Sequence, residues 1–96
     1  MKDHKAELKS YLSDYKVLGE IAAMNDLDLA CQAALVHMRR GDDQAMIGSE
    51  NLKGLALVAR PYYQKALTKA LSEIGHFSVK VTMDKRLSDT LWISWV

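Results

Sequence analysis

The longest patterned stretch of the chain runs from Ser49 to Met83, and its period changes once. From Leu52 to Ile74 apolar residues recur at steps of three and four, which places them on one side of a helix. From residue 77 to residue 84 apolar and polar residues alternate, as in a half-buried strand. Gly75 lies between the two patterns, where a glycine with positive φ commonly ends a helix. The sequence therefore predicts a helix that leads directly into a strand.

Pro61 interrupts this helical pattern. A proline inside a helix removes one hydrogen bond and clashes with the preceding turn, at a cost of about 3 kcal/mol or more. The apolar positions nevertheless stay in phase on both sides of Pro61. We therefore expect either a kinked helix or two nearly collinear helices, the second with Pro61 at its first position. Ser49 is the expected N-cap of the whole segment.

Two further helices are predicted before this segment, over residues 3–24 and 27–39. Asp3 is the expected N-cap of the first, and Asn25-Asp26 the break between the two. Gly41 supplies the stop after the second helix. A short connection favours an antiparallel helix pair. Residues 41–48 read as a loop that carries a small apolar insert, Ala45-Met46-Ile47.

The C-terminal part predicts a β-hairpin. Its strands span residues 77–84 and 91–96, with a turn within residues 85–90 centred on Ser88-Asp89. Both faces of the last strand are apolar, so the pairing register cannot be read. The expected fold is α+β, one domain over residues 1–96, with three helices, the third long and interrupted at Pro61, packed with a C-terminal antiparallel hairpin.

The last strand is apolar on both faces and has no Lys or Pro to protect its edge. A two-stranded ribbon is marginal alone. Tryptophan is enriched at interfaces as well as in cores. We therefore weigh two interpretations equally. In the first, the helices cover both faces or the Trp side chain simply lies on the surface; in the second, the strand pairs with another protein or a second copy of the chain. The partner-binding residues would be Leu91, Trp92, Ile93, Trp95 and Val96.

Composition limits the classes of protein. The formal net charge is +1, the hydrophobic share is 49% and the charged share is 26%, as in ordinary globular domains. No apolar run is long enough to span a membrane, and the N-terminus lacks the apolar core of a secretory signal. Cys31 is the single cysteine, whereas small secreted domains usually carry pairs. We expect a cytoplasmic protein without membrane contact.

Charge is spread unevenly along the chain. Residues 1–52 hold six basic and nine acidic residues, a balance of −3, whereas residues 53–86 hold seven basic and two acidic, a balance of +5. Clustered cations with aromatic neighbours are typical of a nucleic-acid-binding face, although a merely solvated surface carries the same pattern. The nucleic-acid candidates are Lys53, Arg60, Tyr62, Lys65, Lys69, Lys80, Lys85 and Arg86.

Residues that could carry chemistry are sparse. Cys31, His37 and His76 show no paired metal-ligand spacing, and no nucleophile motif or phosphate loop is present. We expect no metal, no cofactor and no catalysis. The preferred hypothesis is a small protein-binding module, such as an accessory or inhibitor protein by which a phage or mobile element modulates a host enzyme. The alternative is a nucleic-acid-binding protein, and a weaker third is an enzyme whose site forms between chains.

Overall fold

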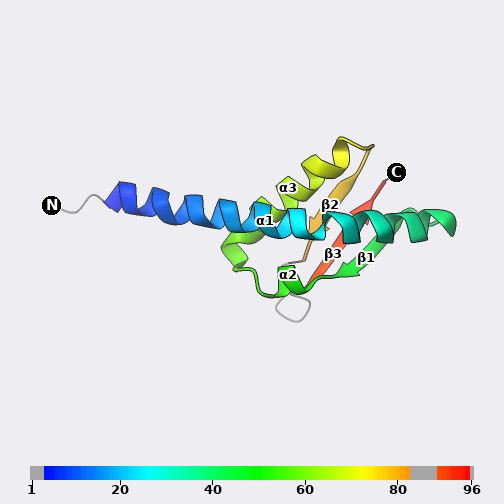
Figure 1. The fold of residues 1–96 in the computed structure, drawn as a ribbon, viewed down its shortest axis with the longest axis horizontal. Helices are drawn as coiled ribbons and strands as arrows, with labels where there is room; N and C mark the ends of the chain where they lie inside the picture. Colours follow the sequence, from blue (N-terminus) through cyan, green and yellow to red (C-terminus); the bar gives the residue numbers. More distant parts are fainter. Residues whose placement is uncertain (1–3, 83–88, 96) are drawn as a thin grey trace.

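The computed structural model describes residues 4–82 and 89–95 (Figure 1). The chain begins with one helix of 36 residues and ends with the central strand of a small sheet. In order, the elements are α1 (His4–Arg39), β1 (Gln44–Gly48), α2 (Glu50–Lys53), the 3₁₀ helix η1 (Leu57–Ala59), α3 (Arg60–Ser72), β2 (Ser78–Val81) and β3 (Thr90–Ser94).

Helix α1 is continuous, so the predicted break at Asn25-Asp26 is wrong. Asp26 does not cap a new helix, because its side chain turns inward and accepts hydrogen bonds from other elements. The predicted stop is confirmed: the helix ends with His37 and Arg39 in its last turn, and Gly41 follows with φ +82°. The predicted cap Asp3 lies outside the described residues.

The segment predicted as one interrupted helix is three pieces. Ser49 caps α2 as predicted, since its side chain accepts from the Leu52 amide at 3.2 Å. The chain leaves the helix at Gly54, before the proline, and Pro61 stands in the first turn of α3, where its missing amide hydrogen costs nothing. Gly75 lies beyond α3 without positive φ, so that detail of the prediction is wrong.

The sheet has three antiparallel strands in the order β1-β3-β2. Residues 44–48, which we expected to be a loop, form β1. The predicted hairpin is therefore correct in part: β2 and β3 pair antiparallel, but β3 pairs with β1 as well. Ile93 lies between Ala45 and Val79 in this register. The premise that the last strand has an open edge is wrong, because both of its edges are filled.

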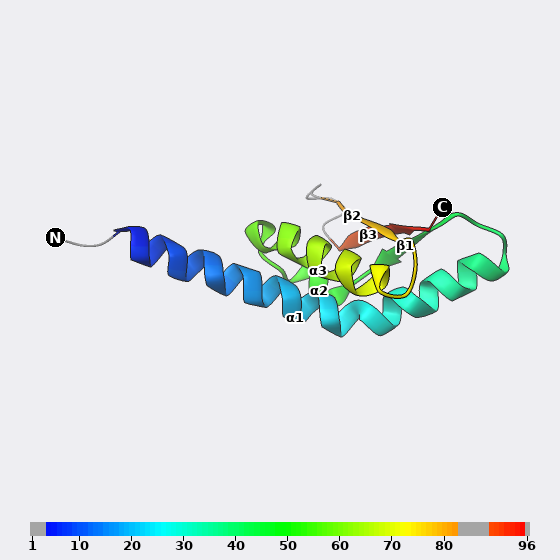
Figure 2. The same cartoon turned by 90° about the horizontal axis from the view of Figure 1, so that it is seen from above.

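One face of the sheet packs against α1 and α3, and Figure 2 shows these helices on the same side of the strands. Strand residues alternate, as the period of two requires, so that Met46, Lys80 and Trp92 point to the uncovered face. The core includes Ala22, Ala23, Ala30, Ile47, Leu52, Tyr63, Leu67, Leu71, Val79, Val81, Leu91 and Ile93.

Helix α1 crosses η1 and the start of α3 at Gly19. A Cβ at this position would lie 2.6 Å from the Ala59 carbonyl oxygen and 2.9 Å from the Tyr63 amide nitrogen. Both are backbone atoms, which cannot rotate away. The glycine therefore permits the close approach of α1 to α3.

The N-terminal part of α1 extends past this crossing, away from the sheet (Figure 1). It gives the molecule an elongated shape, with principal extents of 60 × 30 × 19 Å. Residues 4–18 of α1 are called the overhang below. Within the described residues, no helix combines the length and the apolar character needed to cross a membrane.

Candidate nucleic-acid interface

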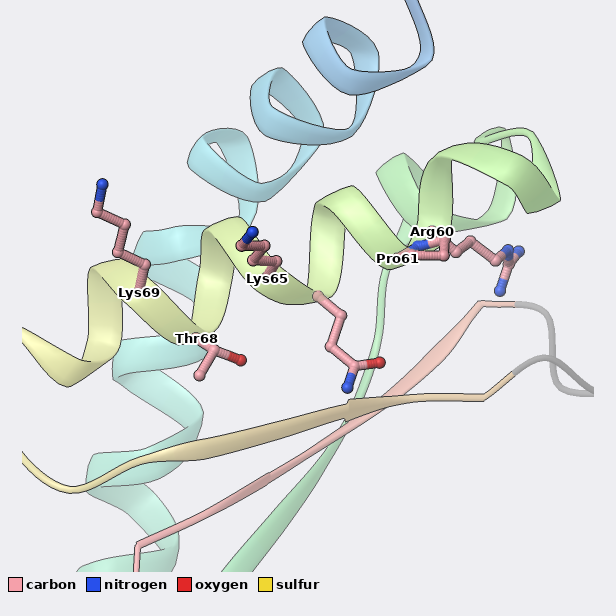
Figure 3. Close-up of a pocket in the computed structure, with 6 residues that line it drawn as sticks. Arg60, Pro61, Lys65, Thr68 and Lys69 are labelled. Carbon is pink, nitrogen blue, oxygen red and sulfur yellow. The ribbon is translucent and has the colours of Figure 1, made fainter. Parts of the chain in front are cut away.

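Helix α3 divides its residues between a buried and an open side. Tyr63, Leu67 and Leu71 recur at steps of four and are fully buried against α1 and the sheet. The opposite side is a shallow surface depression, and α3 alone supplies its lining (Figure 3). The lining residues are Arg60, Pro61, Gln64, Lys65, Thr68 and Lys69.

The open side of α3 is cationic. Lys65 and Lys69 are exposed, lie one turn apart and extend from the same side of the helix (Figure 3). No Asp or Glu occurs between Arg60 and Ser72. Both lysine side chains are exposed and can reach phosphate groups, but they also line the groove between α3 and α1, where Glu20 and Glu73 lie beside them. The sequence did not single out Gln64 and Thr68 as lining residues of this depression, because polar residues at such positions of an amphipathic helix are ordinary.

Arg60 has a different role from the one predicted. It is only 2% exposed, so it cannot be a surface phosphate ligand in this conformation. Its Nη1 donates to the Thr82 carbonyl at 2.9 Å, and its Nη2 donates to the Leu52 carbonyl at 3.0 Å. Burial lowers the pKa of Arg60, and the nearby Asp89 carboxylate partly offsets this shift. Arg60 thus joins the start of α3 to α2 and to the end of β2.

The other predicted basic residues are dispersed. Lys53 is exposed on α2, and Lys80 is exposed on the uncovered face of the sheet. Tyr62 is half-buried at the contact between α3 and α1, where Glu20 and Glu73 also lie. Only Lys65 and Lys69 thus share the open side of α3. Lys85 and Arg86 lie outside the described residues.

A buried polar cluster fixes the position of α3 on α1. The Asp26 carboxylate, 3% exposed, accepts a 2.6 Å bond from the Tyr63 hydroxyl and a 2.7 Å bond from Asn51 Nδ2. The Ser49 hydroxyl donates to the same carboxylate and accepts from the Leu52 amide. A buried carboxylate needs such donors. One side chain of α1 therefore ties together α2, its N-cap and α3.

Tyr63 is the group whose ionisation this cluster affects most. Burial raises the pKa of its hydroxyl far above the ordinary value of about 10, and the hydrogen bond to Asp26 and that residue's charge raise it further. The nearby Ser49 hydroxyl acts in the opposite direction on this pKa but is the smallest contribution. Tyr63 therefore stays neutral and keeps its proton between the two oxygens at all ordinary pH values.

The residues predicted to bind a protein partner are divided between the core and the surface. Leu91 and Ile93 are buried beneath the helices. Trp92 is 38% exposed on the uncovered face of the sheet, opposite the exposed Met46 of β1. Trp95 is half-buried against Phe77, with ring centroids 6.4 Å apart in an edge-to-face arrangement. Val96 lies outside the described residues. The partner-binding role of this strand stays a prediction.

Side chains that bind metals do not gather in the described residues: no group of three or more His, Cys, Asp or Glu lies close enough to hold an ion. Cys31 is a free, half-buried thiol. His37 Nδ1 lies 2.9 Å from an Asp42 carboxylate oxygen, a local contact at the end of α1. Cys31 and His37 therefore lie apart from any group of metal-binding side chains among the described residues.

The comparisons with known proteins give no relative: no family model, no curated protein and no solved structure matches the chain. The geometry of α3 and its neighbours is therefore what points to a function.

Proposed function

We propose that the protein binds double-stranded DNA through the open side of α3. The observation that carries this proposal is the pair Lys65 and Lys69, exposed one turn apart on a helix without acidic residues. An α-helix with side chains is about 10–12 Å wide, and the major groove of B-DNA is about 12 Å wide. A helix whose opposite side is locked into the core can therefore enter the groove.

The order of the elements supports the same proposal. A short helix, a turn and a longer second helix form a helix–turn–helix unit, in which the second helix contacts the bases. Here α2 and α3 have those places, and β2 and β3 follow as an antiparallel pair. Such a unit with a trailing β-hairpin is the winged-helix arrangement. The likeness is one of element order alone, and fold does not by itself imply function.

The polar side chains on α3 differ in the direction in which they point. Lysines that contact phosphates set affinity and orientation without sequence information, whereas side chains that reach base edges select the sequence. Thr68 is half-buried, and Figure 3 shows its side chain pointing towards the strands, away from those of Lys65 and Lys69. Gln64 is also held towards the sheet, because its Oε1 accepts from the Val81 amide at 3.3 Å. The proposed contacts of α3 are therefore those of the two lysines with phosphates.

Fluorescence anisotropy with a labelled duplex tests the proposal. Binding should weaken steeply with salt, since each neutralised phosphate contributes about −0.9 to the slope of log affinity against log salt concentration. Replacing both lysines, Lys65→Ala with Lys69→Ala, should reduce the magnitude of that slope by about 2. Equal salt slopes for the wild type and this variant would contradict the proposal.

A matched control separates a specific face from net charge. Lys65→Glu with Lys69→Glu should abolish binding. Lys9→Glu with Arg39→Glu makes the same change in charge at exposed positions of α1 and should retain most of the affinity. Equal losses in the two double variants would indicate only a general attraction between the protein and DNA.

The protein-binding module stays as a second candidate, because Trp92 is exposed beside Met46 on the uncovered face of the sheet. Aromatic residues and methionine are enriched in interfaces. Trp92→Ala should leave the fold intact, since the side chain does not line the core. A loss of self-association in this variant would favour the C-terminal strand as the contact, and unchanged association would exclude it from that contact.

A further inference from the structure

The overhang carries large apolar side chains with little to cover them. Leu8, Tyr11, Leu12 and Leu18 are 63%, 57%, 54% and 51% exposed. At 1.5 Å per residue the 15 residues of this segment span about 22 Å. Exposed apolar side chains that lie together commonly mark an interaction site. The overhang therefore has the surface for a packing partner.

The spacing of these residues matches a coiled-coil seam. Leu8, Tyr11, Tyr15 and Leu18 are separated by three, four and three residues, which are the a and d positions of a heptad repeat. Tyr15 is half-buried where the overhang meets the body of the fold, and the other three are exposed. The seam therefore faces one direction and is largely open.

The seam reads the same in both directions. Leu-Tyr-Tyr-Leu with spacings of three, four and three is palindromic about Ser13. In an antiparallel pair of two such seams, Leu8 of each chain faces Leu18 of the other, and Tyr11 faces Tyr15. All four layers are then apolar. A two-fold dimer requires a surface complementary to itself, and this pattern meets that requirement.

We propose that the overhang pairs antiparallel with the overhang of a second copy of the chain, through Leu8, Tyr11, Tyr15 and Leu18. Leu57 and Val58 of η1, also exposed, belong to the 3₁₀ helix that α1 crosses and would extend the contact. Four layers are a small interface beside the roughly 800 Å² per partner of stable complexes. The dimer should therefore dissociate in the micromolar range.

Light scattering coupled to size-exclusion chromatography, across the micromolar range, tests for the dimer. The wild type should pass from one to two chain masses as concentration rises. Tyr11→Glu should weaken self-association at least tenfold, because it places a charge in the centre of the seam. A wild type that stays at one chain mass throughout would overturn the proposal.

Two control variants make the result specific to the seam. Ser13→Glu introduces the same charge in the same turns of α1 but on the side away from the seam, and it should dimerise like the wild type. Trp92→Ala should also dimerise like the wild type. A dimer lost in Trp92→Ala and kept in Tyr11→Glu would overturn the proposal in favour of the sheet. Unchanged thermal unfolding midpoints for dilute samples would show that every variant is folded.

Cysteine cross-linking tests the direction of pairing. In a Cys31→Ser background, Leu8→Cys and Leu18→Cys proteins should form a disulfide dimer when mixed under mild oxidation, since the two positions face each other in the antiparallel pair. Each variant alone should cross-link poorly. Efficient cross-linking of each variant alone would indicate parallel pairing and would overturn the antiparallel arrangement.

This inference is independent of DNA binding. Lys16 of the overhang lies in the groove that Lys65 and Lys69 also line, but it is not part of the seam, so Lys65→Glu with Lys69→Glu should leave the dimer unchanged. Tyr11→Glu should retain DNA binding as a monomer but with lower apparent affinity, because a dimer presents two copies of α3 to one duplex.

Discussion

The two parts of α1 are both rich in apolar residues, but only the part that packs on the rest of the fold has fully buried positions, and small residues occupy nearly all of them. Where α1 packs on α3 and the sheet, its buried positions are Gly19, Ala22, Ala23, Asp26, Ala30 and Ala34. In the overhang the corresponding apolar side chains are leucine and tyrosine, and they are exposed. Small residues let a neighbouring helix or sheet approach closely, as the backbone contacts at Gly19 show.

Apolar character alone therefore does not distinguish the side of α1 that enters the core. The small size of the residues on that side does distinguish it. The packed part buries its small residues against α3 and the sheet, and a polar cluster around Asp26 fixes its register, while its own large apolar residues such as Ile21 and Leu35 stay exposed. The overhang has large side chains without such contacts.

Asp26→Ala should have the largest effect on stability. It removes the shared acceptor of Ser49, Asn51 and Tyr63 and leaves buried donors without a partner. The expected loss is about 3–5 kcal/mol in the free energy of unfolding, measured by urea denaturation. Asp28→Ala, two residues along on the exposed side of α1, is the control and should change it by less than about 0.5 kcal/mol. Equal effects would mean that the cluster does not hold the helices together.

Gly19→Ala should be destabilising by about 1–3 kcal/mol. Alanine is favoured over glycine within a helix by up to about 1 kcal/mol, which opposes the effect. The clash should prevail, since the new methyl group would meet backbone atoms of Ala59 and Tyr63 closer than 3.0 Å. Gly48→Ala, where nothing lies within 4 Å of the added atom, serves as the control. A stabilised Gly19→Ala protein would show that α1 and α3 are less closely packed.

Tyr63→Phe should cost about 1 kcal/mol at neutral pH, the usual net value of one hydrogen bond. Its clearer effect is on pH dependence. The pKa of Tyr63 is raised in the folded state. The neutral hydroxyl therefore contributes fully to the free energy of unfolding below the unfolded-state pKa of about 10, and this contribution is lost as the pH rises above that value. Wild-type stability should fall there by about 1.4 kcal/mol per pH unit from this residue.

The Tyr63→Phe protein lacks that contribution, and its stability should therefore decline less steeply above pH 10. Chemical denaturation at a series of alkaline pH values measures both slopes. Parallel curves for the two proteins would show that the hydroxyl is not held neutral by its surroundings.

Leu12→Ser should have the smallest effect. The side chain lies in the overhang without cover in a single chain, so the free energy of unfolding of a dilute sample should change by less than about 0.5 kcal/mol. Leu67→Ala, a leucine fully buried in α3, should by contrast lose about 2–5 kcal/mol. A large loss for Leu12→Ser at low concentration would mean that the overhang is packed within the monomer.

The sequence supported the α+β class, the capping by Ser49, the stop at Gly41 and the start of a helix at Pro61, because each depends on local backbone chemistry. It did not predict the continuity of α1. Asn25-Asp26 has the composition of a helix break, and only the donors of Ser49, Asn51 and Tyr63, distant in the sequence, explain why Asp26 stays helical.

The sheet was predicted only in part, because its pairing also depends on residues that are distant in the sequence. Ala45, Met46 and Ile47 are too few to indicate a strand between two glycines, and their pairing partner lies far along the chain in β3. For the candidate site, Lys65 and Lys69 were identified from their spacing. The burial of Arg60 was not, because a lone arginine beside a proline carries no sign of the carbonyl groups that surround it.

The position of β3 between β1 and β2 has a consequence for how the molecule is made on the ribosome. Synthesis delivers the outer strands first, and neither has a neighbour in the sheet until the middle one emerges. Long-range strand pairing is slow to form and leaves hydrophobic surface open meanwhile. In the nascent chain, Ala45, Ile47, Val79 and Val81 thus stay unpaired until β3 has emerged, and a ribosome stalled before β3 would release a product prone to aggregate.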